Sequence, residues 1–371
     1  MLYKNTLEYI KQRKERIESG KINCIPWGLP RFEEESPGIE QGKYYIITAN
    51  SKVGKTQITD FLFLYNCIQQ IIDNNLNIKL KIFYFTLEMS KEEKMLSAFS
   101  NILYIKEGIR VSPKDLKSTK KDKPLSDKVV KIIEKYQPYF NKIEEIVEFI
   151  DNVRHPTGIY KFLRRYADAK GTQHTKEVTF TNNKTGETFK KEIDDYYEPD
   201  DPDEYVMCIV DHVSLISTEK RDGRILSLHQ SINELSSNYF VQLRNKYNYI
   251  PVLVQQQASS QESNDNLKYN KLKPTLDGLG DNKMTQRDAN TILGLFSPFR
   301  HDIPEYWGYD IKAFKDNIRF LEIMASRDGG GGTVCPLYFD GAVNYFKELP
   351  LPTDQAKMRG VYKKLKSIRN E

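Results

Sequence analysis

The sequence predicts an α/β fold with a mostly parallel, twisted sheet and helices on both faces. Short apolar runs of strand length alternate along the chain with amphipathic runs whose apolar residues recur at helical spacing. The first apolar run, at 44–47, feeds a turn that ends in Gly54-Lys55-Thr56, and a helical pattern follows from Ile58 to Tyr65. A strand, a glycine-containing loop and a helix in this order are typical of a phosphate-binding P-loop.

The composition limits the classes of protein that the chain can belong to. The 371 residues carry a formal net charge of +5, which permits a nucleic-acid partner without arguing for one. No apolar run approaches the roughly 18 residues that cross a bilayer, and the charged N-terminus lacks the apolar segment of a secretion signal. Four cysteines without paired spacing predict a reducing, cytoplasmic environment and argue against a zinc site.

The N-terminal stretch at 5–19 predicts an exposed helix with a narrow apolar stripe of Leu7, Ile10 and Ile17. Such a helix has too little apolar surface to stand alone, so it either packs on another chain or frays. We divide the chain into three parts: a linker-like helix at 1–22, one main domain at 23–350 and a basic, flexible tail at 351–371.

The loop before Ile58 is the strongest candidate for a ligand site, because its backbone N–H groups and the following helix start would point at one anion. Lys55 adds a positive charge beside the outer phosphates of a nucleotide, and the Thr56 hydroxyl can bind Mg²⁺. The predicted nucleotide-binding residues are Ser51, Lys52, Val53, Gly54, Lys55, Thr56 and Gln57. Ala49 stands where the P-loop pattern has its first glycine, and the alternative is a chance Gly-Lys-Thr at a helix start.

Two later apolar runs end on carboxylates. Glu88 follows the run at 81–87 and could polarise a water for attack on a phosphate, or simply cap the next helix. Asp211 follows the run at 205–210, which is the Walker B pattern of a carboxylate that holds Mg²⁺, although this pattern is also common by chance. Since the carboxyl ends of parallel strands share one edge of a sheet, we expect both side chains beside the P-loop.

The strand predicted at 250–254 ends in three glutamines. Gln255, the first of them, is predicted to sense the γ-phosphate, and the alternative is an ordinary loop start. The polar stretch at 258–287 is too long for a simple connection and is therefore functional or disordered. Further strands are expected at 291–296, 319–325 and 334–339, the last within a hairpin with an Asp-Gly turn.

The stretch at about 106–204 predicts an insertion within the main domain, since it has few long apolar runs of its own. Its pattern indicates a lysine-rich loop at 114–128, a helix at 129–150, a second helix at 157–166 and a β-hairpin that turns at 182–186.

Together these pieces resemble the C-terminal ATPase domain of the DnaB-type replicative helicases, which has a RecA-like fold. The resemblance is carried by the Gly-Lys-Thr of the P-loop, by FTLEMS, by IVDHVSLI and by MASRDG, at 54–56, 85–90, 209–216 and 324–329. LVQQQ at 253–257, Lys273-Pro274 and the stretch at 286–289 fit between them. FTLEMS after a P-loop strand is the most specific of these signals.

The resemblance implies ATP and Mg²⁺ as cofactors and ATP-driven movement along single-stranded DNA with unwinding of the duplex. It gives Glu88 the activation of water, Asp211 the support of the metal and Gln255 the sensing of the nucleotide. Arg327 would reach into a neighbouring subunit's site, which requires a ring, and the family implies a hexamer. The stretch at 279–283, through Gly280, Asn282 and Lys283, would hold single-stranded DNA. A primase or a loader protein is a further expected partner.

Several departures from the family pattern accompany the resemblance. Besides Ala49, the family's lysine two residues before the finger is here Ala325, which predicts weaker or differently coupled hydrolysis. The N-terminal domain of the bacterial helicases is not expected, and the insertion lies outside the family core. These departures suggest a version from a phage or a mobile element that works in the host cytoplasm. The alternatives are a RecA-like recombinase or other DNA-dependent ATPase, and a structural or regulatory protein that binds nucleotide with little hydrolysis.

Overall fold

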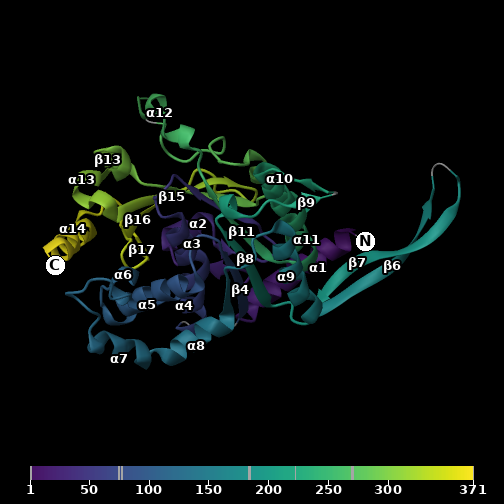
Figure 1. Cartoon of the computed structure of the whole chain (residues 1–371), viewed down its shortest axis with the longest axis horizontal. Coiled ribbons are helices and arrows are strands. Elements are labelled where there is room, and N and C mark those ends of the chain that lie inside the picture. Colours follow the sequence, from purple (N-terminus) through teal and green to yellow (C-terminus); the bar gives the residue numbers. More distant parts are fainter. Residues whose placement is uncertain are drawn as a thin grey trace.

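The computed structural model describes residues 2–73, 76, 78–182, 185–221, 223–268 and 271–370. In this part of the chain the main sheet has nine strands in the order β17-β16-β15-β12-β3-β11-β8-β4-β5 (Figure 1). The strands are β3 (Tyr45–Ala49), β4 (Lys79–Thr86), β5 (Val147–Ile150), β8 (Glu204–Asp211), β11 (Ile250–Gln256), β12 (Thr291–Phe296), β15 (Ile318–Ser326), β16 (Val334–Asp340) and β17 (Tyr345–Glu348). All strands from β12 to β5 run parallel, and the other three are antiparallel, so the predicted mostly parallel α/β sheet is confirmed.

Helices cover both faces of the sheet, as predicted, because successive strand residues point to opposite faces. Tyr45 and Ile47 of β3 pack with the helices of one face, and Ile46 packs with those of the other. The first face carries α3 (Lys55–Asp60), the π-helical turn η1 (Phe61–Tyr65), α4 (Asn66–Ile72), α5 (Lys91–Glu107) and α8 (Gln137–Ile146). The second carries α9 (Pro156–Ala169), α10 (Leu228–Asn233), η3 (Glu234–Phe240) and α11 (Val241–Tyr247).

The stretch predicted as an insertion is largely part of this core. The helix expected at 129–150 is α7 (Asp127–Lys135), α8 and the edge strand β5, which pairs parallel with β4. Pro138 lies in the first turn of α8, where the missing N–H costs nothing, so it ends the preceding helix and starts the next. Only the ribbon of β6 (Gly171–Thr181) and β7 (Thr188–Pro199) extends away from the body (Figure 1). This ribbon is the predicted hairpin, and turn residues 183 and 184 lie outside the described part.

The two ends of the chain are both helical. None of the residues of α1 (Leu2–Glu18) is buried, in agreement with the predicted exposed helix. The tail predicted to be flexible is instead α14 (Gln355–Asn370), which buries Met358 and Leu365 against α13 (Ile311–Phe314) and β15. These two side chains and those between them at helical spacing form an apolar stripe, which the basic composition of the tail obscured.

The long polar stretch at 258–287 folds back on the end of β11. It contains η4 (Ser259–Glu262), α12 (Asn264–Lys268) and η5 (Lys283–Arg287). The backbone N–H of Gly280 donates to the carbonyl of Gln256, at 2.9 Å, and Leu279 forms a bridge with Gln257. The aromatic stretch after β12 forms η6 (Pro298–His301), the strands β13 (Glu305–Tyr306) and β14 (Tyr309–Asp310), and α13. Short elements elsewhere are β1 (Ile25–Pro26), α2 (Pro30–Glu35), β2 (Gly38–Ile39), α6 (Pro113–Leu116), η2 (Val213–Leu215), β9 (Lys220–Arg221), β10 (Arg224–Ile225) and η7 (Lys315–Asn317).

Among the described residues, no helix combines the length and the apolar character that a membrane span needs.

Candidate nucleotide-binding site

The P-loop joins the end of β3 to the start of α3. Gly54 has a φ of +108°, a conformation that only glycine adopts without strain, and α3 begins at the next residue. Ala49 is the last, fully buried residue of β3, in register with Gln256 on one side and Leu295 on the other. Since a strand residue needs no positive φ, the departure at Ala49 introduces no strain into the loop.

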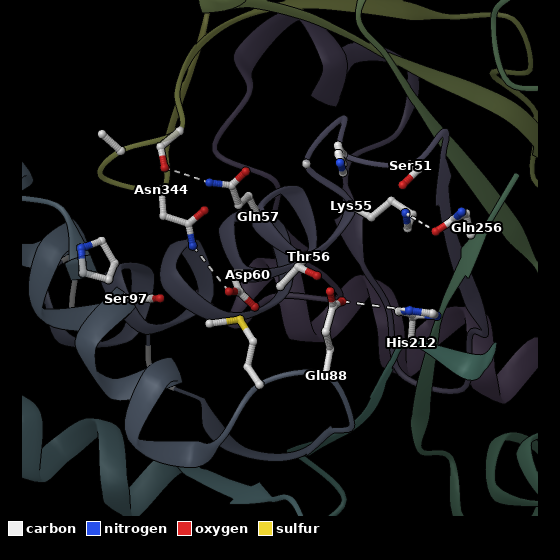
Figure 2. Close-up of a pocket in the computed structure, with 16 residues that line it drawn as sticks. Ser51, Lys55, Thr56, Gln57, Asp60, Glu88, Ser97, His212, Gln256 and Asn344 are labelled. Atoms are coloured by element: carbon white, nitrogen blue, oxygen red, sulfur yellow. Dashed lines mark hydrogen bonds and ion pairs between the residues drawn. The ribbon is translucent and has the colours of Figure 1, made fainter. Parts of the chain in front are cut away.

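A cavity of about 440 Å³ lies over this loop, at the carboxyl ends of the parallel strands. Its lining includes Ser51, Lys52, Gly54, Lys55, Thr56 and Gln57 of the predicted nucleotide-binding set, and Glu88, His212, Gln256 and Asn344 from other elements (Figure 2). Val53 does not line it. The side chain of Val53 is buried in the core, and its carbonyl accepts a hydrogen bond from Arg319 Nε at 2.8 Å. The volume is within the usual range for a site that takes a molecule of nucleotide size.

Lys55 brings a nearly buried positive charge to this cavity. Its Nζ donates to Gln256 Oε1 at 3.2 Å (Figure 2), and no ion pair of Lys55 lies within 4.0 Å among the described residues. Burial lowers the pKa of Lys55, and the nearby charges of Asp211 and Glu88 oppose this shift. An ammonium with only an amide partner is suited to an anionic ligand, because buried charges are normally paired.

Thr56 and Asp211 meet at the other side of the loop. The Thr56 hydroxyl donates to Asp211 Oδ1 at 3.1 Å, and the carboxylate is 1% exposed at the end of β8. Both groups offer the hard oxygen ligands that Mg²⁺ prefers. The described residues contain no group of three or more His, Cys, Asp or Glu that could hold a metal alone. The donor set therefore fits a Mg²⁺ that is shared with phosphate oxygens, rather than one held in a cage of protein ligands.

Glu88 follows β4 and points into the same cavity (Figure 2). Its Oε2 lies 3.9 Å from Nε2 of His212, whose pKa is lowered by burial. The cap of α5 is made by Ser90 and Glu93, which form a reciprocal capping box. The structure therefore assigns the capping of this helix to other residues, and the Glu88 carboxylate faces the ligand cavity.

The glutamine beside Lys55 is Gln256 and not Gln255. Gln255 is fully buried on the opposite side of β11, where it donates to the carbonyls of Gly280 and of Asn282, the latter at 2.8 Å. Strand residues alternate between the two faces, so a shift of one residue exchanges the two roles. The structure thus brings Gln256 to the cavity and gives Gln255 a place in holding the 279–285 loop.

Arg327 lies at the other edge of the sheet. Ser326 is in register with Thr291, which is in register with Tyr45 at the start of β3, whereas the P-loop follows the end of β3. Four residue steps of a strand separate these edges by about 13 Å. Arg327 Nη2 donates to the carbonyl of Arg287 at 2.6 Å, and Ala325 packs against the apolar cluster of the second face. The structure therefore does not bring Arg327 to the P-loop of its own chain.

The predicted DNA contacts lie on the loop that Gln255 holds. Asn282 is 1% exposed and uses its side chain within the chain: Nδ2 donates to the carbonyl of His229 at 3.0 Å, and Oδ1 caps η5. A Cβ at Gly280 would lie 2.9 Å from the carbonyl of Gln256, so this close approach requires glycine. Lys283 is exposed at the surface. Of the three, Lys283 offers a charged side chain to a ligand.

No protein-family model matches the chain, and no curated protein matches it by sequence. Among solved structures, one described as an isolated ATPase domain aligns with a TM-score of 0.64 and 17% identity over 92% of this chain and 98% of its own. A DnaB-like replicative helicase, described with its interactions with primase, aligns with a TM-score of 0.62 and 17% identity over 90% of this chain and 66% of its own. The chain has the fold of a DnaB-type ATPase domain. The expected RecA-like architecture is thus confirmed, and the chain spans about two thirds of that helicase's length.

Within this DnaB-type fold, several residues of the site were not predicted from the sequence. They are Gln256, His212, Asn344, Asp60, Tyr84, Lys94 and Arg300. Arg300 reaches the loop from η6, with its guanidinium on the carbonyl of Ser51 and an ion pair to Glu262 at 3.1 Å. Asp60 and Lys94 were the detectable ones, because each is a charge on an otherwise apolar helical stripe.

Proposed function

We propose that the chain hydrolyses ATP with Mg²⁺ and uses the energy to move along single-stranded DNA and to unwind duplex DNA, as a subunit of a ring. The observation that carries this proposal is the gathering of Lys55, Thr56, Glu88 and Asp211 around one cavity at the carboxyl edge of a parallel sheet. The DnaB-type fold supports the same reading.

At this site, the backbone of the P-loop and Lys55 bind the phosphates, and Thr56 and Asp211 hold the metal. Mg²⁺, when bound, would neutralise developing charge on the outer phosphates. Glu88 lies within reach of the ligand cavity and accepts a proton from the attacking water. Gln256 contacts Lys55 and is the residue of the glutamine triplet placed to respond to the γ-phosphate.

The ring follows from the position of Arg327. An arginine about 13 Å away along the strand direction cannot stabilise charge in its own site, so it acts in the site of a neighbour. Closed rings join identical copies through one repeated head-to-tail contact, and a hexamer is the proposed number. Exposed α1 is available for the same contacts, since none of its side chains is buried in the single chain.

The connection to DNA runs through the end of β11. Gln256 contacts Lys55, and the adjacent Gln255 holds the carbonyls of Gly280 and Asn282. A change at the nucleotide therefore has a route of two neighbouring residues to the loop that carries Lys283. Lys283 would contact the phosphates of single-stranded DNA, and Gly280 and Asn282 would shape the loop. A primase or a loader protein is a proposed partner of the ring.

The test is the rate of ATP hydrolysis by the wild type and by Glu88→Gln, with and without single-stranded DNA. We expect the wild type to be stimulated by the DNA and the variant to bind ATP while losing roughly 100-fold or more of its rate. A wild type that binds ATP but shows no DNA-stimulated turnover would contradict the motor function. A negative-stain image with an ATP analogue and an oligonucleotide should show rings, and filaments would favour a recombinase.

A further inference from the structure

A buried cluster of charged and polar side chains lies directly beneath the nucleotide cavity. It consists of Asp60 on α3, Tyr84 on β4, Lys94 on α5 and Asp211 on β8, each at most 1% exposed. The cluster therefore joins the P-loop helix, both acidic strands and the helix that follows Glu88. Below the cavity it is surrounded by the apolar core of the first face.

Lys94 is the centre of this cluster. Its Nζ lies 3.0 and 3.2 Å from the two carboxylate oxygens of Asp60, 2.7 Å from the Tyr84 hydroxyl and 3.4 Å from Asp211 Oδ2. A buried ammonium is stable only when it is paired and hydrogen-bonded, and these contacts meet that requirement. Because its partners come from three different elements, the ammonium is held in one place.

These contacts fix the orientation of Asp211. Its Oδ2 faces Lys94 and the Tyr84 hydroxyl, which lies 3.0 Å away and also contacts Asp60 at 2.7 Å. Its Oδ1 is thereby turned to the Thr56 hydroxyl at 3.1 Å, on the side of the cavity. A carboxylate bound at one oxygen from below presents the other oxygen to a metal above.

We propose that Lys94, with Asp60 and Tyr84, is a positioning residue that holds Asp211 in the orientation needed to bind Mg²⁺. This inference rests on the proposed function, because the metal site is the one that ATP binding requires. Lys94 also lies one turn into α5, whose cap at Ser90 follows Glu88 by two residues. One buried cation thus ties the segment of Glu88 to the strand of Asp211. A lysine that only neutralised Asp60 would need neither the contact with Asp211 nor the shared tyrosine.

The test is the Mg²⁺ concentration at which a fluorescent ATP analogue is half-maximally bound. The double variant Asp60→Leu/Lys94→Met removes both charges of the pair, so that no single charge is left buried, and should remain folded by circular dichroism. We expect its Mg²⁺ requirement to rise roughly 10- to 100-fold, while binding of the analogue without Mg²⁺ stays as in the wild type. Lys106→Met, which removes a surface charge from the same helix, is the matched control and should leave the requirement unchanged.

Tyr84→Phe is the second variant, because it removes only a hydroxyl. It should raise the Mg²⁺ requirement in the same direction, and it decides the matter if the double variant does not fold. A folded double variant, or Tyr84→Phe in its place, with the Mg²⁺ requirement of the wild type would show that the cluster serves stability alone and would overturn the inference. Because binding is measured without turnover, a chain that binds ATP with Mg²⁺ but does not hydrolyse it contradicts the motor function and leaves this inference standing. A wild type that binds no ATP would overturn both.

Discussion

The buried pair of Lys94 and Asp60 also makes a prediction about stability. In Lys94→Met, two carboxylates 1% exposed lose the cation between them, and the core around them offers no water. Breaking a buried pair at one partner typically costs about 3–5 kcal/mol, whereas replacing both partners by apolar residues is close to neutral. Burial already raises the pKa of Asp60, so uptake of a proton by Asp60 keeps the cost near the lower end, at about 3 kcal/mol.

The assay is urea unfolding of the wild type, Lys94→Met, Asp60→Leu and the double variant, read as a thermodynamic cycle. Residues in direct contact should be strongly non-additive, and we expect a coupling free energy of about 3 kcal/mol between the two sites. The single variants should each be less stable than the double variant. If the two single effects simply add, within about 0.5 kcal/mol, the pair does not interact as its distances indicate and the reasoning fails.

Three further predictions concern other parts of the chain. Burial lowers the pKa of His301 below its usual value near 6.5, so the unfolded chain takes up a proton there before the folded one and stability falls as the pH drops below about 6.5. His301→Gln should therefore flatten the pH dependence of the urea midpoint in that range, and an unchanged slope would count against it. Lys283→Ala should weaken binding of single-stranded DNA and reduce the salt slope of the binding constant by about one, with ATP binding unchanged; an unaltered slope would remove Lys283 from the DNA contacts. Leu365→Ala should lower the free energy of unfolding by about 2–4 kcal/mol, since the side chain is 2% exposed, whereas a flexible tail would show no effect.

The parts of the fold that could be predicted are those where local pattern and core burial agree. The strands at 44–47, 81–87, 205–210 and 250–254 are continuous apolar runs because they are buried on both faces of a parallel sheet, and the structure has strands at all of them. The P-loop could be placed because a loop between a strand and a helix has few conformations that converge on an anion.

The parts that failed depend on tertiary contacts or on a register of one residue. Strand β5 is four residues long and follows a helix without a turn signal, so only its pairing with β4 distinguishes it from more helix. The place of Gln256 required knowing which face of β11 meets the P-loop, and nothing in three consecutive glutamines specifies this. The buried pair of Asp60 and Lys94 joins positions 34 residues apart, and only the packing of α3 against α5 brings them together.

The central claim is that each site is completed by the neighbouring subunit, with Glu88 from one chain and Arg327 from the next. The direct measurement is the ATPase rate of mixed rings of Glu88→Gln and Arg327→Ala, each inactive alone. In an equal, random mixture, about one quarter of the sites combine an intact Glu88 with a neighbour's intact Arg327, so we predict recovery of about a quarter of the sites. If both residues served the same chain's site, every site would carry one defect, and a mixture as inactive as its components would contradict the account.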